Sequence, residues 1–218
     1  VVRDGRAVLV TVAHTTGSAP REAGTTMVIS ASDAAGTIGG GHLEFEAIRI
    51  ARDALANPVA PAPWVVRFPL AARLGQCCGG AATLAFVVVA GPGWLEAATT
   101  CERTSVAFAL VTRIGPGGDA SLQMLVTADD ATGSLGDPAL DSEAIAAARP
   151  RAQARATGAW MVPTASCIGT TLLVHAVARG LAQQYADHPV DRWRKAFAEV
   201  ATQLDEIEGR GAPRPHDN

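Results

Sequence analysis

The sequence has little of what marks several specialised classes of protein. Only 5% of the 218 residues are aromatic, and the formal net charge is -3. Such a chain lacks the positive excess that draws a protein to nucleic acid or to an anionic membrane surface. Its longest apolar runs, such as residues 81–90, fall well short of the roughly 20 residues that a membrane-spanning helix needs. These absences favour a globular chain without nucleic acid or membrane partners.

Export signals and a disulfide framework are missing as well. No charged segment followed by an apolar core stands at the N-terminus, and the four cysteines do not have framework spacing. We therefore expect reduced thiols and a cytoplasmic location. The length suits one large domain or two small ones, with enough residues to bury a core.

Short apolar runs and one helical pattern define the N-terminal half. Residues 7–13, 25–30 and 81–90 are rich in β-branched residues and predict buried strands. After the glycines at 39–41, apolar residues recur at helical spacing, and Asn57-Pro58 ends that pattern. The alternation of strands and a helix predicts an α/β fold.

An internal repeat organises the chain. Residues 26–52 align without a gap to residues 123–149, with a shared Gly-Thr/Ser-Ile/Leu-Gly opening and a shared Glu-Ala-Ile. We therefore predict a duplicated strand–loop–strand–helix unit that forms one mixed α/β domain over residues 1–155. A short, mainly helical region is expected over residues 156–209, and a disordered tail over residues 210–218.

Only the first copy has side chains suited to binding. The unpaired amide groups at a helix N-terminus favour an anion, and Gly39, Gly40 and Gly41 would let a phosphate approach them closely. The alternative is a tight turn that needs positive φ. His42 suits a ligand or a solvated surface equally, and Glu44 is also a favourable charge near a helix N-terminus. Arg21, in a loop of small residues, suits a phosphate or plain solvent.

A second candidate is the segment Gln76-Cys77-Cys78, which two glycines follow. Adjacent cysteines can rarely form a disulfide with each other. A thiolate is a nucleophile and a soft-metal ligand, whereas a free cysteine is otherwise a small buried hydrophobe. No second pair has the spacing of a structural zinc site. Cys101 and Cys167 are isolated, and we predict that both are packing residues.

Three segments in order resemble one known family. RAVLVTVAHTTGSAPREAGTTMVIS (6–30), GTIGGGHLEFEAIRIARDAL (36–55) and LGQCCGGAATL (74–84) resemble the N-terminal domain of the xanthine dehydrogenase accessory proteins, the XdhC/CoxI family. The resemblance covers residues 5–149. It implies a chaperone that binds the molybdenum cofactor, protects it while a cysteine desulfurase supplies sulfur, and delivers it to a molybdenum hydroxylase such as xanthine dehydrogenase.

The resemblance gives the candidate residues a common task. The cofactor, bound as cargo, pairs a soft metal with a phosphate-bearing pterin, so a thiolate suits the metal and a glycine-opened helix suits the phosphate. The chain is then a maturation chaperone rather than a catalyst, and Cys78 or Cys77 would meet the molybdenum. The predicted cofactor-binding residues are Arg21, Gly39, Gly40, Gly41, His42, Glu44, Gln76, Cys77 and Cys78.

The C-terminal part departs from that family. Residues 170–185 contain an apolar run and His175 but no G-x-G-x-x-G motif, so the family's dinucleotide-type domain is absent or altered here. Residues 191–209 predict an amphipathic helix whose apolar face includes Trp193 and favours a homodimer. Two rival functions stay open: a thiol-dependent redox or sulfur-transfer enzyme using Cys77 or Cys78, and a paralogue that only scaffolds a dehydrogenase subunit.

Overall fold

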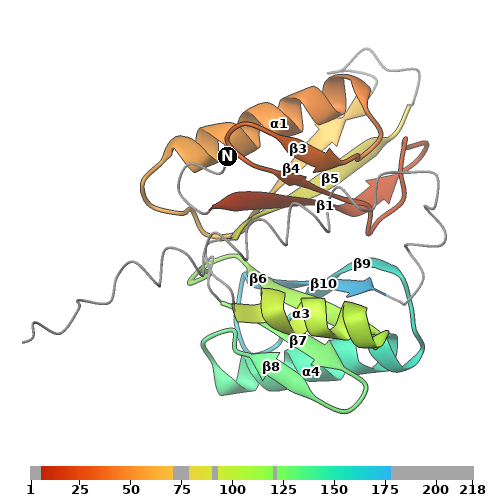
Figure 1. The fold of residues 1–218 in the computed structure, drawn as a ribbon, viewed down its shortest axis with the longest axis vertical. Helices are drawn as coiled ribbons and strands as arrows, with labels where there is room; N and C mark the ends of the chain where they lie inside the picture. The colour runs from red at the N-terminus through yellow and green to blue at the C-terminus, as the bar shows by residue number, and fades with distance from the viewer. Residues whose placement is uncertain (1–5, 71–78, 90–92, 120–121, 178–218) are drawn as a thin grey trace, which may run out of the picture.

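Two five-stranded antiparallel sheets form the protein, each from one continuous half of the chain (Figure 1). The structure is a computed structural model that describes residues 6–70, 79–89, 93–119 and 122–177. The first sheet has the strand order β3-β2-β1-β5-β4, and the second has the order β8-β7-β6-β10-β9.

The first half contains β1 (Ala7–Thr16), β2 (Thr26–Ile29), β3 (Ala34–Gly36), α1 (Gly41–Ala56), β4 (Trp64–Pro69) and β5 (Ala81–Val89). The second half begins with α3 (Gly93–Thr104) and continues with β6 (Phe108–Ile114), β7 (Gln123–Thr127), β8 (Ala131–Gly133), α4 (Pro138–Gln153), β9 (Gly158–Pro163) and β10 (Thr171–Val177). We call residues 6–89 the first unit and residues 106–177 the second unit.

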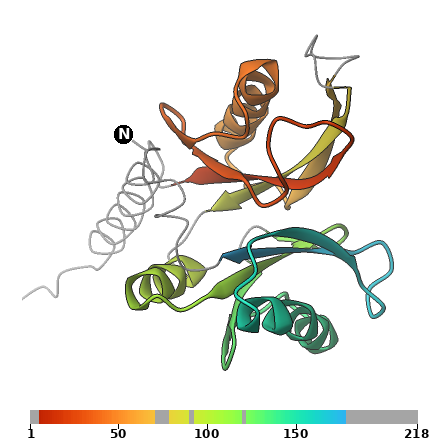
Figure 2. The same ribbon diagram turned by 90° about the vertical axis from the view of Figure 1, so that its right-hand side faces the viewer.

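The sheets lie face to face, and α1 and α4 cover their outer faces. Figure 2 shows α1 outside the first sheet and α4 outside the second, so the layers run helix, sheet, sheet, helix. Helix α3 packs on β7 and β8, where its Ala98 and Cys101 join Phe108 and Leu125 in a small buried cluster.

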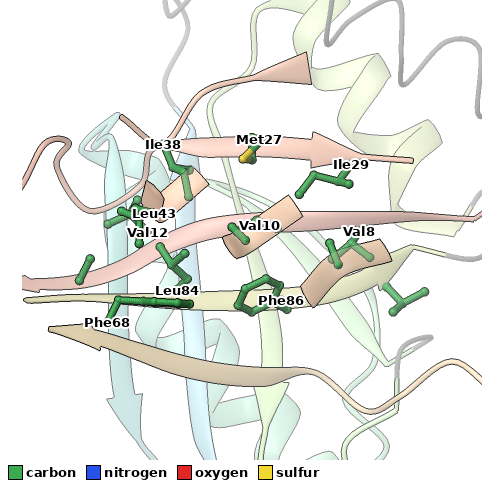
Figure 3. Close-up of a cluster of buried hydrophobic side chains, with 14 of the residues drawn as sticks. Val8, Val10, Val12, Met27, Ile29, Ile38, Leu43, Phe68, Leu84 and Phe86 are labelled. Carbon is green, nitrogen blue, oxygen red and sulfur yellow. The ribbon is translucent and has the colours of Figure 1, made fainter. Parts of the chain in front are cut away.

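The core beneath α1 follows from the sequence pattern. Leu43, Ala47 and Ala51 recur every four residues, so they form one buried stripe along the helix. Alternate residues of β1 and β5, such as Val10 and Phe86, meet that stripe (Figure 3). Side chains on the opposite face of each strand build the interface between the sheets, where Ala13, Ala85, Ile114, Ala159 and Leu173 are buried together.

The predicted duplication is confirmed, and it is larger than the sequence alignment indicated. Both units have the same strand order, and the helix enters at the same point of each. Trp64 lies opposite Phe86 in the first sheet, and Trp160 lies opposite Val174 at the equivalent place in the second. The repeated unit therefore consists of five strands and one helix.

The structure differs from the expectation for the region that begins at residue 156. Residues 158–163 and 171–177 are strands, not helices, and they complete the second sheet. The apolar run of β10 is buried because β6 and β9 pair with it on either side. The first domain therefore extends beyond residue 155. The predicted closing helix with Trp193 and the predicted tail lie outside the described residues.

Candidate functional site

Three segments of the first unit meet at one end of the strands of the first sheet. These are residues 17–24, which we call the site loop, residues 37–41, which we call the glycine turn, and Gly80 at the start of β5. A Cβ atom placed on Gly39 would lie 2.7 Å from Cβ of Pro20 and 3.4 Å from Cγ of Arg21. A Cβ atom on Gly80 would lie 2.4 Å from the carbonyl oxygen of Ser18. Glycine is thus required for this close approach, which places Arg21 beside the turn.

Glu44 holds the glycine turn in shape. Its Oε2 accepts hydrogen bonds from the Thr37 hydroxyl (2.6 Å) and from the amides of Ile38 (3.1 Å) and Gly40 (3.0 Å). In the second unit Asp141 has the same place: its carboxylate accepts from Ser134 Oγ and from the Leu135 amide, both at 2.7 Å. This carboxylate is therefore part of the scaffold that both units share, whereas cofactor binding by Glu44 stays a prediction.

The two helix N-termini differ in how their amides are capped. Asp137 precedes α4, and its carboxylate accepts from the amides of Ala139 (2.8 Å) and Leu140 (3.1 Å). Gly40 precedes α1, which has no side-chain cap among the described residues, and a Cβ atom on Gly40 would meet nothing within 4 Å. The second unit thus shows an anionic group at the position that the first unit leaves open.

The interpretation of the glycines as a tight turn that needs positive φ is confirmed. Gly39, Gly40 and Gly41 have φ angles of 121°, 73° and 64°, a region that side chains other than glycine rarely adopt. The turn therefore needs glycine for its backbone, and phosphate binding there stays a prediction. Both interpretations concern the same residues, so the sequence alone could not separate them.

His42 and Phe45 lie exposed on the first turns of α1. The imidazole of His42 is 3.8 Å from the Glu46 carboxylate and meets the Phe45 ring edge-on, with 6.2 Å between ring centroids. Phe45 is 64% exposed, although it is a large apolar side chain. Sequence reasoning missed it, and the available signal was an aromatic residue outside the buried stripe of the helix.

The predicted residues Gln76, Cys77 and Cys78 lie outside the described residues. The residues that flank their segment are described: the amide of Leu70 donates to the carbonyl of Gly80 at 3.0 Å. Gly80 also contacts the site loop, at the backbone of Ser18. Binding by these three side chains stays a prediction.

The other two cysteines pack as predicted. Cys101 lies on the buried face of α3, and this burial raises the pKa of its thiol. Cys167 packs on the second core from the loop between β9 and β10, and its Sγ is 3.9 Å from an Arg113 nitrogen. That loop is the second unit's counterpart of the segment that contains the cysteine pair.

The loop that contains Cys167 is tied to α4. Glu143 accepts from the amides of Ala165 (2.9 Å) and Ser166 (2.8 Å), and hydrogen bonds from Ser166 and Ala165 lower the pKa of its carboxyl group.

Over the ranges that the structure describes, no group of three His, Cys, Asp or Glu side chains could hold a metal ion. No helix in those ranges is long and apolar enough to cross a membrane.

Comparisons with known proteins agree with the fold and with the family resemblance. The fold is similar to a chain described as a xanthine dehydrogenase from Bacillus halodurans, with a TM-score of 0.54 and 13% sequence identity over 80% of this chain. The match covers 50% of that longer chain, and at this identity it shows a common fold. No curated protein matches this chain. A model of the XdhC and CoxI family matches residues 2–68, which include Arg21 and the glycine turn. The family match therefore supports the sequence resemblance over the N-terminal part of the chain.

Proposed function

We propose that this protein is a maturation factor for a molybdenum hydroxylase of the xanthine dehydrogenase type, and that it binds the molybdenum cofactor as cargo. The family match over residues 2–68 supports a maturation role. The observation that carries the binding proposal is the uncapped N-terminus of α1, because an aspartate carboxylate occupies the same position in the second unit.

The described residues fit an anionic group at this position. The amides of His42 and Leu43 correspond to those of Ala139 and Leu140, which Asp137 binds in the second unit. An anion at a helix N-terminus gains about 0.3–1 kcal/mol from the helix dipole. Arg21, which the close approach of Gly39 places beside the turn, offers a guanidinium that can bind two oxygens of one phosphate.

A thiolate would complete the site on its metal side. Cys77 or Cys78 is the proposed contact for molybdenum, because sulfur ligands suit a soft metal. Gly80, which follows that segment, contacts Ser18 of the site loop, and Arg21 of the same loop lies beside Gly39, which supports one continuous binding region. A cysteine desulfurase is the proposed sulfur donor, and the molybdenum hydroxylase is the proposed recipient. The rival thiol-dependent enzyme depends on the cysteine pair alone.

Cofactor retention on gel filtration tests the proposal. The purified protein is incubated with molybdenum cofactor, and molybdenum and pterin are measured in the protein peak. We expect one cofactor per binding site and a loss of about fivefold or more in affinity for Arg21→Ala, since a charged hydrogen-bond partner is removed. Arg67→Ala is the matched control, because Arg67 is exposed on β4. No retention by the unmodified protein would refute the binding proposal, and equal losses in both variants would remove Arg21 from the site.

A further inference from the structure

The C-terminal end of the site loop contacts the second unit. A Cβ atom on Gly24 would lie 2.5 Å from Cα of Gly158, the first residue of β9. Both glycines have positive φ, 98° at Gly24 and 147° at Gly158. Two backbones therefore meet there at a distance that no side chain allows. Ala23, next to Gly24, packs against the apolar cluster between the sheets.

The carbonyl oxygen of Gly24 is bound from both units. Within the first unit it accepts from the Thr26 hydroxyl at 3.2 Å. The Thr26 oxygen is 3.1 Å from the Thr11 hydroxyl, which must donate because the Thr26 hydrogen is already used. From the second unit, the imidazole of His175 on β10 is the other donor to Gly24.

His175 is suited to this contact because of its surroundings. In the second sheet it lies between Leu110 and Ala159, both buried and apolar. Burial lowers the pKa of His175 to about 4, although the Gly24 carbonyl opposes that shift. The imidazole is therefore neutral at pH 7 and has a single N–H group to donate. Gly24 receives it.

We infer that His175 is a positioning residue for the anion site, acting across the interface between the units through the carbonyl of Gly24. The second unit fixes one end of the site loop, and Arg21, three residues before Gly24, is thereby kept beside Gly39. The link to cofactor binding depends on the proposed function above, whereas the fixing of the loop does not.

Amide hydrogen exchange on the full chain tests the positioning without any ligand. In His175→Phe, which keeps a ring but has no donor, we expect exchange of the site-loop amides to rise about tenfold, the size expected for the loss of one hydrogen bond. In His175→Gln, whose side-chain amide can donate, exchange should return toward the original rate. His175→Leu is measured in parallel, so that a folding defect in one variant does not decide the result.

Met161→Ala is the matched control, because Met161 packs on the same inter-sheet cluster and is not the donor to Gly24. It should leave exchange of the site loop unchanged. Unchanged exchange of the site loop in both His175→Phe and His175→Leu would overturn the inference. An equal rise in exchange in Met161→Ala and His175→Gln would overturn it as well. Molybdenum cofactor retention is the second arm, with a loss of about threefold expected in His175→Phe and recovery in His175→Gln.

The two arms separate the two proposals. If the unmodified protein retains no cofactor, the proposed function fails, and the exchange data still decide whether His175 fixes the loop. If the protein retains cofactor and His175→Phe has a faster-exchanging loop with unchanged affinity, the positioning of the anion site is refuted.

Discussion

The two units share a scaffold and differ at one helix N-terminus. In both, a carboxylate on the first turns of the helix holds the preceding turn, Glu44 in the first unit and Asp141 in the second. In the second unit Asp137 also caps the helix, whereas Gly40 leaves the corresponding amides open in the first. The shared carboxylate belongs to the common scaffold, so we propose the position at which the units differ, Gly40, as the place where an anionic ligand binds.

The interface between the units gives the largest expected effect, through His175. Its pKa is about 4 in the folded protein and 6.5 when unperturbed, so between these values the unfolded chain binds the extra proton. The free energy of unfolding is therefore highest above pH 6.5. It falls by roughly 3 kcal/mol in all as the pH drops toward 4. Urea unfolding from pH 7.5 to 4.5 should show this loss in the unmodified protein and a flatter profile in His175→Phe. Parallel profiles would contradict it.

The loop cysteines give the next largest effect and compare the two units directly. Cys77→Ser or Cys78→Ser should weaken retention of the molybdenum cofactor at least about tenfold, because a protonated hydroxyl is a poor ligand for a soft metal. Cys167→Ser, in the corresponding loop of the second unit, is the control and should retain the cofactor fully. Thermal melts of all three variants report on folding. Full retention in both first-unit variants would end the hypothesis of a thiolate ligand.

The cap of α4 gives a smaller effect, on stability alone. Asp137→Ala removes hydrogen bonds to two helix amides and should lower the free energy of unfolding by about 1 kcal/mol. Cofactor retention should not fall, since the proposed anion site lies at α1 in the first unit, which this substitution leaves intact. Urea unfolding and gel filtration of the same sample measure both quantities. A loss of cofactor retention without a loss of stability would mean that the anion site lies in the second unit, which contradicts the proposal.

Local patterns in the sequence predicted much of the fold. The apolar periodicity of residues 43–55 located α1, and the aligned segments 26–52 and 123–149 predicted the duplication. The strands β9 and β10 were missed because their pairing is non-local: β10 pairs with β6, about 60 residues earlier in the chain. A short apolar run alone does not distinguish a strand from a helix.

The site was predictable in part. The uncapped helix could be predicted from the contrast between Gly40 and Asp137-Pro138, since aspartate at the cap and proline in the first turn are typical of a helix start. The approach of Arg21 to Gly39 could not, because it depends on how the site loop packs on the turn. The contact of His175 with Gly24 joins residues about 150 positions apart, and no local pattern marks it.

The most direct measurement concerns the open position at Gly40. Gly40 has φ 73° and ψ -168°, so any side chain strains the backbone there, and Gly40→Ala must accompany Gly40→Asp as a control for that strain. Cofactor affinity is measured for both. The carboxylate of Gly40→Asp would occupy the anion position and repel phosphate, so its affinity should be about two- to fivefold below that of Gly40→Ala. Equal affinities in two folded variants would contradict an anion site at this helix N-terminus.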